Sequence, residues 1–460
     1  MALTGSRPLQ SQAGSQMRNM TLRRAALAGF LGTFVEWFDY ACYAYLATVF
    51  AVAFFPESDS RSGLIAAYAV FALSFVVRPV GGVIWGHLGD RFGRKLALSL
   101  SIFIMSAATA AIALLPTFAI AGLWAPALLL LTRLLQGFAA SGEYAGAASF
   151  LSEYAPRKRR GIYTSLVPAG EATGLLAASL FVAFLHVVLS GEQMHDWGWR
   201  IPFLFALPLG LVGVFVRRQL EETPHFQKLE HGDATSSIPV LELVTTYRVE
   251  LLIGFGATML NAVGFYLVLG YMPVYLTAEL GLSERPAFLG ATIALIVYLA
   301  SIFAMATLSD RLGRKAVLLT CSILFAIVTV PLFMMVTSMS VHITEGSAIF
   351  TVLLAWSVFA ALLAMNGGTL PTFLCELYST RVRFSGFAIS FNSANALFGG
   401  TAPLLSTWLI GQTGSTLAPA WYLVVAAIIT MLAVGFSKVA RNPDLNGTPP
   451  PTFSPEESSR

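Results

Sequence analysis

Charged residues are scarce in this chain of 460 residues, because Asp, Glu, Lys and Arg together make up only 11% of it. An ordinary soluble protein carries roughly 25% charged residues. Hydrophobic residues make up 56% of the chain, and the mean hydropathy is +0.72. The 28 basic and 24 acidic residues are too few to keep the surface of a soluble globule hydrated. This composition excludes a soluble enzyme, a disordered chain and a nucleic-acid-binding protein, and it favours a polytopic membrane protein.

Cysteine and the common catalytic motifs are also rare or absent. The three cysteines, Cys42, Cys321 and Cys375, lie in apolar runs, which favours packing roles over a disulfide scaffold. The sequence contains no G-x-x-x-x-G-K-[ST] loop for ATP and no H-E-x-x-H, C-x-x-C or G-x-S-x-G string. We therefore expect no ATP-driven pump, no enzyme, no metal and no cofactor.

Long apolar runs divide the chain into twelve predicted membrane spans. A bilayer core of about 30 Å needs roughly 20 apolar residues per helical span. The spans lie at approximately 24–53, 63–87, 96–115, 120–150, 162–189, 201–217, 250–278, 286–308, 316–337, 347–375, 385–411 and 419–437. Residues 1–20 are polar, and we expect the first span to act as an uncleaved insertion signal.

The basic residues gather in every second connection between the spans. Twelve spans place both chain ends on one side of the membrane, and most of the 28 basic residues lie on that side. Only Arg61, Arg200 and Arg285 lie on the other side, while Arg78 and Arg133 fall within spans. Because cytoplasmic loops carry the excess of Lys and Arg, we expect both termini in the cytoplasm. The pI near 9.0 then reflects topology and not a nucleic-acid partner.

Two motifs repeat along the chain at nearly the same offset. GHLGDRFGRK (86–95) returns as ATLSDRLGRK (306–315), and FLSEYAPRKRRG (150–161) returns as FLCELYSTRVRFSG (373–386). This repetition predicts two homologous six-helix halves with a central site between them. The expected organisation is an N-terminal cytoplasmic segment (1–23), a first half (24–217), a central cytoplasmic loop (218–249), a second half (250–437) and a disordered cytoplasmic tail (438–460).

Several strings, in order along the chain, resemble those of a known family. D-R-x-G-R-K follows the second span and recurs after the eighth, and R-x-x-Q-G lies in the fourth span. With GTFVEWFDYACY (32–43), QGFAASGEYAGA (136–147) and DWGWRIPF (196–203), they resemble the metabolite:proton symporter group of the major facilitator superfamily. The resemblance covers essentially the whole chain. It implies an all-α polytopic membrane fold with 12 transmembrane helices in two pseudo-symmetric halves, working by alternating access in the bacterial inner membrane.

The resemblance leaves several substrates open. Carriers of this group take proline and betaine-type osmolytes, 2-oxoglutarate, citrate or shikimate. EETPHF (221–226) and YMPVYLT (271–277) are most similar to proline/betaine carriers, whereas NGGTLPTF (366–373) and FGGTAP (398–403) fit citrate-type carriers equally well. The short tail lacks heptads, which argues against the osmotic activation found in carriers with a C-terminal coiled coil.

The expected function is proton-coupled symport of a small carboxylate-bearing metabolite. The leading substrate is an osmolyte of the proline or glycine-betaine type, and the alternative is a di- or tricarboxylate. A proton-antiporting exporter and a non-transporting receptor are alternatives of other classes. The expected partners are a small-molecule substrate, protons and the lipid bilayer, and we expect a monomer.

Six charged residues lie inside the predicted spans and away from their ends, all of them in the first half: Glu36, Asp39, Arg78, Arg133, Glu143 and Glu171. A charge near mid-bilayer costs roughly 2.5–3.5 kcal/mol on insertion scales, so each suggests a function. The second half carries uncharged polar residues instead: Asn261, Tyr266, Tyr271, Asn366, Asn392 and Asn395. We therefore expect the first half to handle protons and the second half to shape the substrate site.

Glu36 and Asp39 are three residues apart, which places both carboxylates on one helix face. Neighbouring carboxylates in a low dielectric repel each other, so one should hold a proton more readily than an isolated carboxylate. Arg133 keeps its own proton but can pair with a carboxylate and be displaced from it. We expect Asp39 or Glu36 to bind the transported proton, with Arg133 as the competing charge. The alternative is a permanently paired cluster that only fixes helix packing.

The other buried charges are candidates for the substrate site. Arg78 suits bidentate binding of a carboxylate, or else it extends toward the membrane interface. Glu143 lies among small residues and is a candidate either for coordinating a cation or for packing. Glu171 lies outside the family strings and is either substrate-selective or a pore-lining residue without a special role. The predicted substrate-binding set is Arg78, Glu143, Glu171, Tyr266, Asn366 and Asn395.

Charged residues at one end of the spans are predicted to gate access. They are Asp90, Arg91, Arg94, Glu153 and Arg157 in the first half, and Asp310, Arg311, Arg314, Glu376 and Arg381 in the second. A carboxylate near a helix end, surrounded by cations, can form a latch that breaks when the two halves rock. In the family, the motif stabilises one face of the alternating-access cycle. The alternative is that these basic loops only hold the topology.

Overall fold

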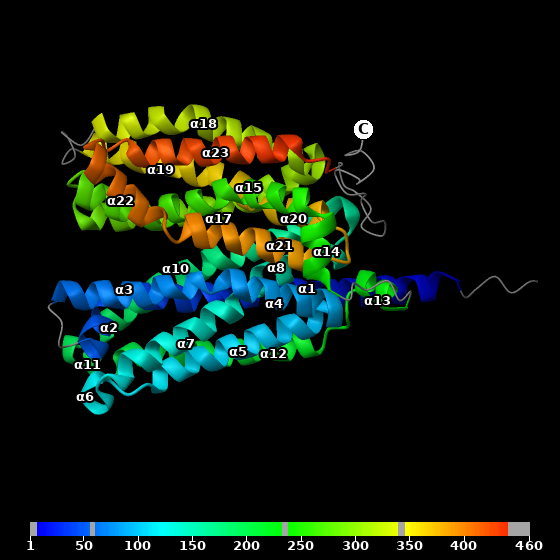
Figure 1. The fold of residues 1–460 in the computed structure, drawn as a ribbon, viewed down its shortest axis with the longest axis horizontal. Helices are drawn as coiled ribbons and strands as arrows, with labels where there is room; N and C mark the ends of the chain where they lie inside the picture. Colours follow the sequence, from blue (N-terminus) through cyan, green and yellow to red (C-terminus); the bar gives the residue numbers. More distant parts are fainter. Residues whose placement is uncertain (1–6, 56–59, 232–237, 339–345, 440–460) are drawn as a thin grey trace, which may run out of the picture.

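The computed structural model describes residues 7–55, 60–231, 238–338 and 346–439, and within these ranges it contains helices and no strand. The helices form two bundles that lie side by side along their length (Figure 1). Helices are expected here because a chain in lipid must satisfy its backbone polar groups within each segment. The predicted tail beyond residue 439 lies outside the described residues.

The first half and the central loop contain helices α1 to α14. They are α1 (Arg7–Tyr45), α2 (Ala47–Phe54), α3 (Ser60–Val76), α4 (Arg78–Phe92), α5 (Arg94–Leu114), α6 (Phe118–Ala121), α7 (Trp124–Ala140), α8 (Glu143–Tyr154), α9 (Arg160–Thr164), α10 (Leu166–Val188), α11 (Gly191–Asp196), α12 (Ile201–Arg218), α13 (Pro224–His231) and α14 (Pro239–Thr246), with short 3₁₀ turns η1 (Arg157–Arg159) and η2 (Gly198–Arg200). α1 thus begins well before the predicted first span, and α13 and α14 fold within the predicted central loop.

The second half repeats this pattern with more irregular helices. It contains α15 (Arg248–Gly264), η3 (Phe265–Tyr271), α16 (Met272–Val274), η4 (Tyr275–Glu279), α17 (Glu284–Leu312), α18 (Arg314–Ser338), α19 (Gly346–Gly367), α20 (Leu370–Leu377), α21 (Arg383–Ala394), η6 (Asn395–Gly399), α22 (Ala402–Thr413) and α23 (Ala418–Phe436). Three of these segments, η3, η4 and η6, are π-helical, which is common at functional sites.

Nine helical stretches of the described residues are long and apolar enough to cross a membrane, or ten if α1 and α2, which meet at 66°, form one span. Two of the twelve predicted spans, the fourth and the eleventh, are not among these stretches. The fourth is divided into α7 and α8 at Ser141 and Gly142, and the eleventh into α21 and α22 around η6. A Ser–Gly pair is a frequent cause of a helix kink, which explains the first break.

The outside of the bundle is apolar, as a bilayer requires. Val187 is 87% exposed, Phe436 77% and Leu404 73%, and many other large apolar side chains are exposed along the helices. A soluble monomer rarely exposes such contiguous apolar surface. The charged groups lie inside the bundle or at its ends.

The closest contact between the two halves joins α4 to α21. Gly82, Gly86 and Gly89 on α4 face α21, and a Cβ on Gly86 would lie only 2.5 Å from the Cα of Ser385. The small-residue spacing on α4 therefore serves helix contact, as the sequence suggested. Asp90 lies near the end of α4, which contacts α14. We call this end of the bundle, where α14 lies at the right of Figure 1, the charged end.

Candidate functional site

Two arginine–carboxylate pairs lie buried in the middle of the first half. Nη2 of Arg78 is 2.9 Å from Oε1 of Glu36, and Nη1 of Arg133 is 3.0 Å from Oδ2 of Asp39. Gln136 donates a second hydrogen bond, of 2.9 Å, to the same oxygen of Asp39. These four charged side chains are at most 4% exposed. The two acids of helix α1 therefore have separate arginine partners, where the sequence suggested Arg133 for either of them.

Arg78 occupies an aromatic environment at the start of α4. Its guanidinium carbon lies 4.5 Å from the ring centre of Phe75 and 4.9 Å from that of Tyr40. A guanidinium is weakly hydrated and stacks well on aromatic faces, so it tolerates this burial. Arg78 is 4% exposed, so it is buried within the protein.

Both pairs keep polar atoms that have no hydrogen-bond partner among the described residues. These atoms are Oε2 of Glu36, Nε of Arg78, Oδ1 of Asp39, and Nε and Nη2 of Arg133. A buried polar group without a partner costs roughly 1–3 kcal/mol, and more if it is charged. The pairs can therefore accept a proton or a polar substrate group without first breaking every existing contact.

Glu143 does not lie between the two halves, and its charge is already compensated. It forms a very short bidentate pair with Arg217, which also donates to the carbonyl oxygens of Leu98 at 2.6 Å and Ala28 at 3.2 Å. A Cβ on Gly32 would overlap this pair, so the glycine makes room for it. All these contacts come from the first half, and they compensate the charge of Glu143 within that half.

Arg217 corrects the sequence interpretation that only six charges are buried within the spans. Its place at the end of a predicted span suggested a cytoplasmic loop residue, but it is 3% exposed. Its side chain extends back between α1, α5 and α8 because Glu143 and two carbonyl oxygens satisfy its donors there.

The polar candidates of the second half differ in their contacts. Tyr266 packs between the rings of Trp37, at 6.3 Å, and Phe75, at 5.9 Å, both in the first half. Asn366 is fully buried, and neither atom of its amide has a partner among the described residues. Asn395 donates to the carbonyl of Phe391 in its own helix. Tyr266 thus lies at the interface of the halves, while the amide of Asn395 is partly used by its own helix.

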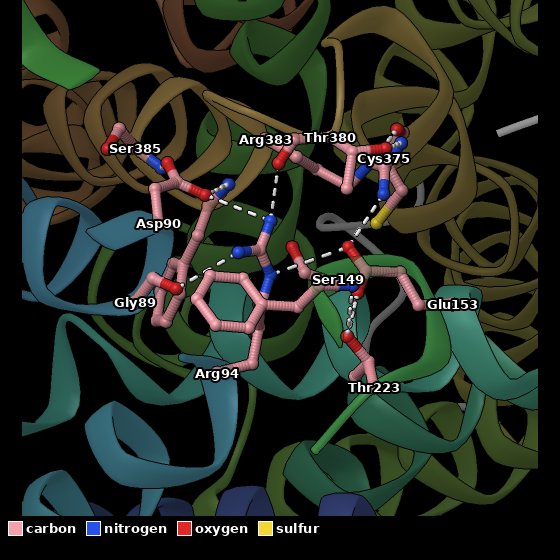
Figure 2. A network of polar contacts seen from close by, with 12 residues as sticks. Gly89, Asp90, Arg94, Ser149, Glu153, Thr223, Cys375, Thr380, Arg383 and Ser385 are labelled. Carbon is pink, nitrogen blue, oxygen red and sulfur yellow. Dashed lines mark hydrogen bonds and ion pairs between the residues drawn. The ribbon is translucent and has the colours of Figure 1, made fainter. Parts of the chain in front are cut away.

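At the charged end, a buried network of ion pairs and hydrogen bonds joins the two halves (Figure 2). We call four of its residues the first latch: Asp90, Arg94, Glu153 and Arg383. Arg94 lies 3.1 Å from Asp90 and 3.5 Å from Glu153, and Arg383 lies 2.6 Å from Glu153. Asp90 also accepts hydrogen bonds from the backbone N–H groups of residues 384 and 385, at 3.1 and 2.8 Å. These N–H groups begin α21, where the helix dipole favours a negative charge.

The motif of the second half repeats this arrangement. We call these four residues the second latch: Asp310, Arg314, Glu376 and Arg160. Arg314 lies 2.8 Å from Asp310 and 3.3 Å from Glu376, and Arg160 lies 3.5 Å from Glu376. Asp310 accepts from the N–H groups of residues 161 and 162, at 2.9 and 3.2 Å, at the start of α9. Each half therefore supplies an aspartate that caps a helix of the other half, and these contacts join the two halves at the charged end.

The latch partners of Glu153 and Glu376 differ from the predicted ones. Arg157 is exposed, and Arg381 forms a half-exposed pair with Glu242 of α14 at 3.5 Å. Arg160 and Arg383 form the ion pairs with Glu376 and Glu153 instead, because each begins the helix that follows the turn and points inward. Arg91 and Arg311 are also exposed and belong to neither latch.

Residues of the central loop brace the first latch. The hydroxyl of Thr223 donates a very short hydrogen bond to Glu153, and Glu222 accepts from the N–H of Lys95 at 3.0 Å. The ring of Phe226 lies 4.9 Å from the guanidinium of Arg94. Burial raises the pKa of Glu222 above its ordinary value and lowers the pKa of His225 below 6.5.

Two helical halves, buried ion pairs within the first half and reciprocal latches at one end define a multi-pass membrane transporter. Comparison with known proteins gives the family. The family model described as "Sugar (and other) transporter" matches this chain twice, over residues 25–237 and 226–440. The chain belongs to this family and, with it, to the major facilitator superfamily.

Relatives with similar sequences and a solved structure agree with this placement. A glycine betaine/proline/ectoine/pipecolic acid transporter of Dickeya dadantii is 36% identical over 441 residues, which cover 93% of this chain and 86% of the relative. A proline/betaine transporter of Escherichia coli K12 is 35% identical over 449 residues, covering 95% and 87%. The proton:xylose symporter XylE, bound to 6-bromo-6-deoxy-D-glucose, has the same fold, with a TM-score of 0.75, 18% identity and coverage of 91% and 95%.

Proposed function

We propose that the protein is a proton-coupled symporter that imports a small carboxylate-bearing metabolite, with proline or glycine betaine as the leading substrate. The names of its two relatives at 35–36% identity support this substrate class. A di- or tricarboxylate is less well supported, because the acids Glu36, Asp39 and Glu171 outnumber the arginines Arg78 and Arg133 at the centre. The protein acts in the bacterial inner membrane, with its termini and its charged end in the cytoplasm.

The pair of Glu36 and Arg78, 2.9 Å apart, carries this proposal. Glu36 and a substrate carboxylate compete for the same guanidinium. When Glu36 takes up a proton it loses its charge, and Arg78 is then free to bind the carboxylate through its planar fork of donors. Release of the substrate returns Arg78 to Glu36 and expels the proton. This exchange couples one proton to one carboxylate.

Asp39 and Arg133 form a second pair one helical turn away. We propose that this pair opens and closes as the halves rock, and that Asp39 carries a proton while Arg133 is displaced. With both latches closed, the site opens only to the side opposite the charged end. Breaking the latches then opens the cytoplasmic path, which completes the alternating-access cycle.

Uptake into proteoliposomes under an imposed proton gradient tests this function. We expect the wild-type protein to accumulate radiolabelled glycine betaine or proline against its gradient. Glu36→Gln and Asp39→Asn should retain exchange of labelled for unlabelled substrate but lose proton-driven accumulation. Glu192→Gln, a matched change at an exposed site on α11, should accumulate normally. Undiminished accumulation in both buried variants would contradict the coupling mechanism, and proton-driven efflux would favour an exporter.

A further inference from the structure

Glu171 differs from the other buried acids at the centre of the protein because it has no basic partner. Glu36, Asp39 and Glu143 each pair with an arginine, whereas Glu171 forms no ion pair with any described residue. Its side chain is 6% exposed, and the indole N–H of Trp37 donates a hydrogen bond to it. A buried carboxylate without a cation is costly, so its retention suggests a ligand.

Helix packing fixes Glu171 in this position. Gly170 and Gly174 of α10 lie directly against the backbone of α1, where a Cβ would come within 2.7 Å of the Phe30 oxygen or 2.6 Å of the Phe34 oxygen. This close approach places Glu171 beside Trp37. Helix α10 also contacts α17 of the second half.

Aromatic residues from both halves lie near this carboxylate. Tyr144, Tyr266 and Tyr298 all lie within electrostatic range of Glu171, and Trp37 contacts it directly. Trp37 in turn packs at 6.3 Å from Tyr266. Tyrosine and tryptophan faces attract a cation, and they suit a quaternary ammonium group that can donate no hydrogen bond.

Unsatisfied polar groups of the second half border the same region. The hydroxyl of Tyr298 is fully buried and has no hydrogen-bond partner among the described residues. The amide of Asn366 is in the same situation, and the neighbouring Gly367 lies against the Tyr298 hydroxyl. Tyr298 and Asn366 therefore keep polar atoms available to a ligand.

We propose that Glu171, Trp37, Tyr144, Tyr266 and Tyr298 form the subsite for the positively charged nitrogen of a zwitterionic substrate, whose carboxylate binds Arg78. The inference rests on the proposed function and narrows it from carboxylates to zwitterions. Glu171 is within electrostatic range of both Glu36 and Arg78, so one small molecule can span the two subsites. The nitrogen compensates the otherwise unpaired carboxylate, and the rings exclude water from it.

A pair of ligands of the same shape tests the subsite directly. Glycine betaine carries a trimethylammonium group, and 3,3-dimethylbutyrate replaces that nitrogen with carbon but keeps the carboxylate. At pH 7.5 both carboxylates are ionised. Titration calorimetry of purified full-length protein, without a proton gradient, should show glycine betaine binding about 10- to 100-fold more tightly to the wild type.

Variants of the subsite should remove this selectivity. In Glu171→Gln, the affinity for glycine betaine should fall about 10- to 100-fold while that for 3,3-dimethylbutyrate stays within about threefold, and Glu171→Asp should recover part of the loss. Tyr298→Phe keeps the ring and should stay selective, whereas Tyr298→Leu should lose selectivity. The unchanged binding of 3,3-dimethylbutyrate shows that a variant is folded.

Three results would overturn the subsite. They are equal binding of the two ligands by the wild type, retained selectivity in Glu171→Gln, and an equal loss of both ligands in that variant. If Glu171→Gln still prefers glycine betaine over 3,3-dimethylbutyrate but loses proton-driven accumulation, Glu171 is a proton-binding residue instead. A wild type that binds selectively but accumulates nothing under a proton gradient would refute the symport mechanism and leave the subsite standing.

Discussion

Asp90 offers the sharpest test of the closed charged end. Asp90→Ala removes two carboxylate hydrogen bonds to the N–H groups that begin α21, at 3.1 and 2.8 Å, and the contact with Arg94. Hydrogen bonds to a charged group contribute about 1.5–3 kcal/mol each, so at the lower limit the closed form loses about 3 kcal/mol. Since 1.4 kcal/mol is a factor of ten, we expect a shift of about 100-fold toward the open form.

The native Cys375 reports this opening. It is fully buried on α20 beside Ser149 of α8, across the interface of the two halves (Figure 2). In a background of Cys42→Ser and Cys321→Ser, maleimide labelling of this thiol should be slow, and Asp90→Ala should accelerate it strongly.

The matched control for this experiment is Arg91→Ala, because Arg91 is adjacent in sequence but exposed and outside the latch. It should label as slowly as the parent protein. Asp90→Asn keeps one acceptor oxygen and should label at an intermediate rate. Equal labelling of Asp90→Ala and Arg91→Ala would refute the view that the aspartate cap holds this end closed.

Two further predictions concern stability. Glu143→Gln leaves Arg217 buried without its counter-charge, which should destabilise the protein by about 3–5 kcal/mol in thermal unfolding. Changing both Glu143 and Arg217 to Gln should recover part of the lost stability. His225 has a pKa below 6.5 in the folded latch because of burial, so the unfolded chain binds its proton first as the pH falls. Thermal stability should therefore decrease as the pH drops below 6.5, and this decrease should be smaller in His225→Gln. An equal decrease in the wild type and the variant would contradict the assignment to His225.

Apolar run length and repeated motifs predicted the fold well, because each span must satisfy its backbone internally. The same patterns could not predict rotation about helix axes, which decides partners. For this reason Arg78 was a candidate for binding substrate or for extending to the membrane interface, although its side chain meets Glu36 of another helix. The burial of Arg217 likewise depends on the space that Gly32 leaves on α1.

The true latch arginines had a signal in the sequence. Arg160 follows Glu153 by seven residues, and Arg383 follows Glu376 by the same seven, whereas Arg157 and Arg381 have unequal spacings. A spacing shared by the two repeats is stronger evidence for an ion pair than closeness in the sequence, because homologous halves have the same geometry. The unpaired state of Glu171 had no such signal, since it depends on the absence of a neighbour in three dimensions.

The reciprocal caps make the two halves behave like the subunits of an isologous dimer joined into one chain. In such a dimer, the same surface serves on both sides, and each contact occurs twice. Asp90 accepts hydrogen bonds from N–H groups of the second half, and Asp310 accepts them from N–H groups of the first. When the aspartate of one half leaves its latch, a helix of the other half therefore loses its cap. A motion on one side of the pseudo-twofold axis is in this way transmitted directly to the other side.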